Sequence, residues 1–186
     1  MRKIIFALLA SMMIQNMKSQ LKVAGVDVPY IYKTSESVLK LNGAGIREKY
    51  FMDMYVGALY LKERQSNQKH IIEADETMCI KLHIVSGLIT SDKMVSAVEE
   101  GFEKSTNKNT QPLRDKIEQF KKVFSEKVNK GDIYDIVYEE KVGTVIYKNG
   151  VKKDVIAGLG FKKALFGIWF CDKPADSNLK KKMLGQ

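Results

Sequence analysis

Short segments in which apolar and polar side chains alternate dominate the first half of the chain. In residues 78–85 the even-numbered positions from Met78 to Ile84 are apolar, whereas Lys81 and His83 fall on the other side. Because successive side chains of a strand point to opposite faces, this pattern predicts a half-buried β-strand. Further strands are predicted at residues 38–41 and 54–61, after a hairpin within residues 21–29.

The pattern then changes to the period of an α-helix. Met94, Val98 and Phe102 recur every four residues, and Ser91 is an expected N-cap. A second helix is expected to begin near Pro112, because proline suits a first helical position. Its apolar stripe consists of Leu113, Ile117, Phe120 and Phe124.

Strands return in the last third of the chain. They are predicted at residues 132–139, 144–147 and 151–156, with Asn149-Gly150 as a tight hairpin turn between the last two. Residues 161–170 and 174–184 are expected to form closing helices. This order predicts an α+β fold, with helices on one face of an antiparallel sheet. No repeat or Pro/Gly-rich linker divides residues 21–186, which favours one domain.

Residues 1–20 have the pattern of a secretory signal peptide. Arg2 and Lys3 precede an apolar run from Ile4 to Ile14, and a polar stretch reaches Gln20. The run is too short to span a bilayer stably. We therefore expect an exported, periplasmic or secreted protein with no stable membrane span after cleavage. The alternative is a buried first helix.

Composition and charge argue against several classes of partner and site. The 186 residues carry a formal charge of +9, which falls to +6 without Arg2, Lys3 and Lys18. The lysines are spread along the chain, and the cluster at residues 180–182 is typical of a solvated helix face, so no nucleic-acid partner is expected. Two cysteines and two histidines are too few to suggest a metal site. The sequence also indicates no cofactor.

Familiar catalytic motifs are absent from the sequence. Gly43-Ala44-Gly45 lacks the third small residue of a dinucleotide fingerprint, because Glu48 occupies that position. No P-loop, nucleophile elbow or Cys/His pair can be assembled. The sequence predicts no catalytic residue.

Arg47 is the most informative single residue. A guanidinium in an apolar strand is costly unless it meets an anion, since it stays charged and offers a planar fork of donors. If the chain reverses near Phe51, Arg47 and Tyr55 face each other across two antiparallel strands, and Gly57 leaves space beside them. This pair would form a carboxylate clamp. Alternatively, Arg47 pairs with one of the chain's own acids.

The residues around this pair resemble the chalcone isomerase family. Leu41-Asn-Gly-Ala-Gly-Ile-Arg47 is similar to the family's Gly-x-Gly-x-Arg strand, and residues 55–61 resemble the strand that follows. Residues 161–184 are similar to the closing helices of bacterial chalcone isomerase-like proteins. The resemblance implies an open-faced β-sandwich, with a ligand cleft between a large antiparallel sheet and a helical layer.

The resemblance also implies roles for single residues. Arg47 falls on the arginine that meets the ligand's anionic group. Tyr55 stands where isomerases carry threonine and the fatty-acid-binding members carry tyrosine. On the first helix, Thr90 and Ala97 take the places of an isomerase Tyr and Asn, and Ala97 cannot hold a ketone or ordered water. Arg47, Tyr55 and Thr90 are the expected ligand-binding residues.

Three functions remain open from the sequence. The favoured one is a non-catalytic binding protein that holds a fatty acid or a similar amphipathic carboxylate. The second is an isomerase or intramolecular lyase that acts on a chalcone-like or other unsaturated small molecule. The third is a structural or partner-binding protein whose cleft is filled by its own side chains.

Overall fold

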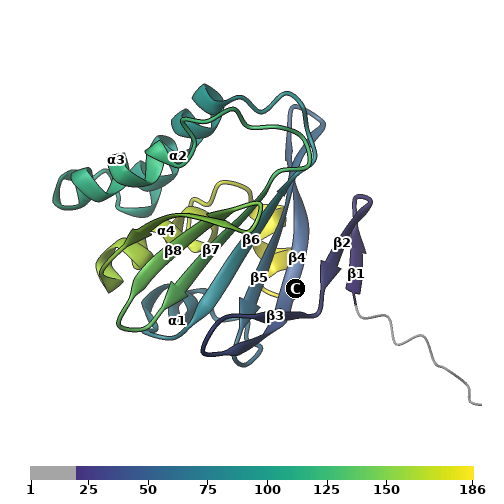
Figure 1. Ribbon diagram of the computed structural model, residues 1–186, viewed down its shortest axis with the longest axis horizontal. Helices are drawn as coiled ribbons and strands as arrows, with labels where there is room; N and C mark the ends of the chain where they lie inside the picture. The colour runs from purple at the N-terminus through teal and green to yellow at the C-terminus, as the bar shows by residue number, and fades with distance from the viewer. Residues whose placement is uncertain (1–19) are drawn as a thin grey trace, which may run out of the picture.

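A computed structural model describes residues 20–186, and the predicted signal peptide lies almost wholly outside them. A seven-stranded antiparallel sheet dominates the fold, and its strands neighbour one another in chain order (Figure 1). They are β3 (Ile31–Lys33), β4 (Val38–Lys49), β5 (Met52–Leu61), β6 (Met78–Ile84), β7 (Ile133–Glu139), β8 (Gly143–Lys148) and β9 (Val151–Ile156). A separate hairpin consists of β1 (Gln20–Val23) and β2 (Val26–Pro29).

Five α-helices pack against this sheet or extend from its edge. They are α1 (Gln68–Glu73), α2 (Ser91–Ser105), α3 (Arg114–Lys122), α4 (Leu159–Phe170) and α5 (Ser177–Met183). Helix α4 is buried on almost every side, because it packs against α1 and α2 as well as β8. The α+β class and the large antiparallel sheet with a helical layer are confirmed.

The sheet has an apolar core on each face. The main core lies under the helices and includes Met78, Ile80, Leu82 and Ile84, the four positions that the alternation in β6 assigned to one face. A smaller core on the opposite face includes Tyr60 and Cys79, with Val28 contributed by the β1–β2 hairpin. The second face is therefore partly covered, which the prediction of helices on a single face did not include.

Several boundaries differ from the sequence prediction. Strand β4 continues without interruption to Lys49, and both β3 and α1 were not predicted. The N-cap of α2 is Thr90 rather than Ser91. Pro112 lies within a 3-10 turn over Gln111–Leu113, and α3 begins only at Arg114. Helix α3 ends at Lys122 because the backbone N–H groups of the next three residues bond to carbonyls three positions back, which leaves Phe124 beyond the helix.

The glycines of β4 allow helix α5 to pack closely on the strand. A Cβ atom at Gly43 would lie 2.1 Å from the Lys182 carbonyl oxygen, and one at Gly45 would lie 2.7 Å from the Lys182 Cβ. On β5, the space beside Gly57 is occupied by Leu179 of the same helix, not left open beside Tyr55 as predicted. Small residues are thus required here because a helix packs on the strands.

Candidate functional site

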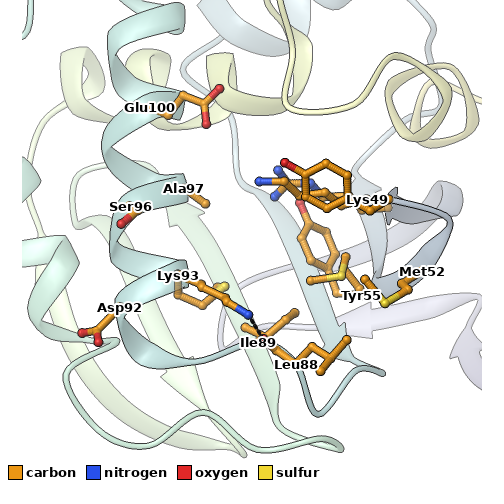
Figure 2. A pocket seen from close by; sticks show the side chains of 14 residues that line it. Lys49, Met52, Tyr55, Leu88, Ile89, Asp92, Lys93, Ser96, Ala97 and Glu100 are labelled. Carbon is orange, nitrogen blue, oxygen red and sulfur yellow. Dashed lines mark hydrogen bonds between the residues drawn. The ribbon is translucent and has the colours of Figure 1, made fainter.

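A cavity of about 330 Å³ opens between the β4–β5 hairpin and helix α2 (Figure 2). Its walls are mainly apolar, and they come from the β4–β5 hairpin, from the segment after β6 and from α2. The apolar wall residues are Met52, Met54, Leu88, Ile89, Met94 and Ala97. This size lies at the lower end of the range for small-molecule sites.

Arg47 and Tyr55 lie opposite each other on neighbouring strands, as the sequence predicted. They are register partners in the β4–β5 ladder, and the guanidinium carbon of Arg47 lies 5.6 Å from the centre of the Tyr55 ring. The hairpin reverses at Tyr50 and Phe51, where both residues have positive φ. The β-ladder therefore delivers both side chains to the same face of the sheet.

The guanidinium of Arg47 makes no ion pair or hydrogen bond with any residue in the described range 20–186. Glu100 lines the same cavity, but its carboxylate accepts a hydrogen bond of 2.6 Å from Lys104. That bond is the main reason why the pKa of Glu100 is lowered, and the charge of Arg47 adds only a small part. The sequence alternative of a pairing between Arg47 and an internal acid is not found in this range.

Tyr55 is held from behind by helix α4. Its side chain is buried, and the indole Nε1–H of Trp169 donates a hydrogen bond of 3.0 Å to its hydroxyl oxygen. An indole nitrogen only donates, so Tyr55 must act as the acceptor in this pair. The hydroxyl hydrogen of Tyr55 is consequently left to donate elsewhere. No sequence pattern linked Trp169 to Tyr55, because 114 positions separate the two residues.

The inner end of the cavity is nearly closed by the core. A hollow of about 30 Å³ continues past Arg47 and Tyr55, and Phe120, Phe124 and Ile136 are among the residues that surround it. Arg47 and Tyr55 line both spaces, so they stand at the inner end of the larger one. An anionic head group held there would direct an attached chain outward, toward Met52 and Leu88.

Thr90 does not lie with the other two predicted site residues. It is exposed and caps α2, and its hydroxyl oxygen accepts a hydrogen bond of 3.3 Å from the backbone N–H of Lys93. The cavity wall includes Ala97 instead, and Figure 2 shows Ala97 facing the hairpin while Asp92 and Ser96 point away from it. Lys93, which no sequence pattern marked as a site residue, also lines the cavity and donates a hydrogen bond of 2.9 Å to the Leu88 carbonyl.

Other chemistry is sparse in the described residues. Within residues 20–186, no group of three His, Cys, Asp or Glu side chains is arranged to hold a metal ion. Cys79 and Cys171 are both free thiols. Among the helices of this range, none has the length and apolar character needed to cross a bilayer.

Comparisons with known proteins agree on the fold. A family model described as chalcone isomerase-like matches residues 20–185. The crystal structure of a fatty-acid binding protein from Arabidopsis thaliana superposes with a TM-score of 0.67 at 18% sequence identity, covering 86% of this chain and 92% of that chain. No curated protein sequence matches this chain.

The family match covers nearly all of the described residues and includes the strand that carries Arg47. The structural match extends over most of both chains and confirms the curled antiparallel sheet with its helical layer. The protein belongs to the chalcone isomerase-like family.

Proposed function

We propose that this protein binds a fatty acid or a similar amphipathic carboxylate without changing it chemically. The observation that carries the proposal is the Arg47 guanidinium, which has no anionic partner among residues 20–186 and stands at the inner end of an apolar cavity. A half-buried cation in such a place is stabilised by an anion that enters from outside.

The geometry supports a head group with two oxygen acceptors. Arg47 offers a planar fork of N–H donors, and Tyr55 offers one O–H that Trp169 leaves free. The apolar wall around Met54, Ile89 and Met94 suits an aliphatic tail. An open space of about 330 Å³ beside Arg47 favours a bound ligand over a cleft filled by the protein's own side chains.

The comparison with the Arabidopsis thaliana fatty-acid binding protein supports the same ligand class, since the two folds superpose over most of their lengths.

We further propose that the protein is exported, because residues 1–20 have the pattern of a signal peptide. Sequencing the N-terminus of protein from the native cell envelope tests this part. A mature chain that starts near Gln20 is expected, and intact Met1 would refute cleavage.

The direct test of binding is mass spectrometry of small molecules that co-purify with the protein from its native source. We expect a fatty acid or a related carboxylate at near-equimolar amount. Isothermal titration with the same compound and with its methyl ester then isolates the head group. Equal affinities for acid and ester would contradict a carboxylate clamp.

Trp169 offers a selective perturbation of this clamp. Trp169→Phe removes the N–H that fixes the Tyr55 hydroxyl, so the hydroxyl becomes free to rotate and loses part of its orientation toward the ligand. We expect the affinity for a fatty acid to fall by roughly three- to tenfold, in line with the loss of one hydrogen bond. The affinity for the methyl ester should change much less. Equal losses for both ligands would indicate a general packing defect instead.

An isomerase is the second candidate, because an unpaired Arg47 beside a tyrosine hydroxyl would also polarise a ketone. The helix that borders the cavity contributes Ala97 rather than a polar side chain at the corresponding wall position, and each missing catalytic group costs about a hundredfold or more. We therefore expect no acceleration of naringenin chalcone cyclisation above the spontaneous rate, as followed by absorbance. A saturable, stereoselective rate that Arg47→Ala abolishes would establish the enzyme and overturn the binding protein.

A further inference from the structure

Exposed apolar side chains gather around the mouth of the cavity. Eight large apolar side chains are exposed in residues 20–186, and four of them belong to the hairpin turn and to the segment after β6. These four, which we call the apolar tip, are Tyr50, Phe51, Met52 and Leu88. Phe51 is fully exposed and Tyr50 is 77% exposed. Such a concentration at one end of a protein marks a contact surface.

The shape of the β4–β5 hairpin makes this tip protrude. The pairing between β5 and β6 ends at Tyr55 and Ile84, whereas β4 and β5 remain paired out to Lys49 and Met52. The hairpin consequently reaches past the ends of the central strands (Figure 1). At its turn, Tyr50 and Phe51 have φ of 53° and 61°, a conformation that hairpins usually give to Asn or Gly. Aromatic residues are therefore displayed at a position that local structure alone does not favour.

The tip is continuous with the binding cavity. Tyr50, Met52 and Leu88 are partly exposed and also line the cavity, so the apolar surface runs from the outside into the mouth. The Nζ atom of Lys49 lies 5.5 Å from the centre of the Tyr50 ring, so a cation stands beside the aromatic side chain. An aromatic ring with an adjacent lysine is typical of the boundary between lipid tails and head groups.

We propose that the apolar tip docks on a lipid bilayer and inserts Tyr50 and Phe51 at its surface. A narrow protruding turn is unlike the broad patches of roughly 800 Å² that each partner contributes to a stable protein complex, whereas it suits insertion by 5 to 10 Å below the head groups. The positive charge of the chain, +6 once Arg2, Lys3 and Lys18 are excluded, adds attraction to anionic lipids. Docking in this orientation opens the cavity directly onto the lipid.

The passage of ligand between bilayer and cavity rests on the proposed function, but docking itself does not. The two are separated by measuring fatty-acid affinity in solution without vesicles and vesicle affinity without added fatty acid. Phe51 is absent from the cavity wall, so Phe51→Asp is expected to leave the solution affinity unchanged. The same variant should weaken co-sedimentation with vesicles of phosphatidylcholine and phosphatidylglycerol by about tenfold or more.

Fluorescence gives the position of the tip in the membrane. The chain has a single tryptophan, Trp169, which is buried, so Phe51→Trp introduces one exposed reporter. Vesicles with brominated acyl chains should quench that reporter. Val142→Trp is the matched control, because Val142 is also an exposed apolar residue in a hairpin turn but lies at the opposite end of the sheet. It should not be quenched.

Each alternative result would overturn the proposal. Equal quenching at both positions would show adsorption without orientation, and no quenching at position 51 would show that the tip stays in water. Self-association that Phe51→Asp abolishes, together with no vesicle binding by the wild type, would assign the tip to a second copy of the chain.

Discussion

Arg47→Ala is expected to weaken the binding of a fatty acid by at least about tenfold while the fold is retained. A hydrogen bond to a charged group contributes roughly 1.5 to 3 kcal/mol, and a poorly hydrated cavity favours the upper part of this range. The fold should survive because Arg47 has no ion pair or hydrogen bond within residues 20–186 that the substitution would break. Titration calorimetry measures the affinity, and urea unfolding checks stability.

Lys49→Ala is the matched control for this variant. Lys49 lies two residues after Arg47 on the same strand and also lines the cavity. It is exposed and lies nearer to the turn of the hairpin. If the carboxylate binds at the inner end, Lys49→Ala should change the affinity by less than about threefold. A larger loss for Lys49→Ala than for Arg47→Ala would place the head group at the mouth and reverse the orientation of the ligand.

Local patterns in the sequence were sufficient for most of the sheet. The alternation in β6 and the Asn149-Gly150 turn before β9 report short-range geometry, and both are found in the structure. Helix α1 was missed because its six residues carry only one buried side chain, Ile71, so no helical period is visible. The close packing of α5 on Gly43 and Gly45 could not be predicted from the sequence either, because it depends on contacts across about 140 positions.

For the candidate site, too, local relations could be predicted from the sequence and long-range contacts could not. Arg47 and Tyr55 could be paired from the sequence because a single hairpin relates them. Next to the turn, Glu48 pairs with Asp53, and a register shift between Arg47 and Glu48 then sets Arg47 opposite Tyr55. Thr90 was assigned by resemblance alone, and the structure gives its hydroxyl the local task of capping α2. Trp169 reaches Tyr55 from the closing helix, a relation that only the folded chain creates.

Helix α4, which carries Trp169, is anchored by a buried lysine. Lys162 is completely inaccessible to solvent, and its ammonium donates three hydrogen bonds, to the carbonyls of Ile71 at 2.6 Å, Ile72 at 3.0 Å and Ala74 at 2.8 Å. These carbonyls lie at the C-terminal end of α1, where a helix leaves its acceptors unsatisfied. Lys162 therefore joins α1 to α4, and its position two turns before Trp169 links this contact to the site.

Lys162→Met is expected to lower the free energy of unfolding by about 3 kcal/mol or more. Methionine fills a similar volume, but it leaves three carbonyl oxygens without their donor, and each buried unsatisfied group costs roughly 1 to 3 kcal/mol. Urea unfolding at pH 7 measures the loss. Lys163→Met is the control, since its partner Glu73 is exposed and a surface ion pair contributes about 1 kcal/mol at most. Equal effects of the two variants would contradict a structural role for Lys162.

The pH dependence of this difference provides an independent test. Burial lowers the pKa of Lys162 to about 8, so the folded protein releases this proton before the unfolded chain does, which holds it up to the ordinary lysine value near 10.5. Between these values the unfolded state binds more protons, and the contribution of Lys162 to stability therefore increases as the pH rises. The stability difference between wild type and Lys162→Met should widen from pH 7.5 to pH 9.5. A difference that stays constant or narrows over this range would show that the ammonium is not destabilised by its burial.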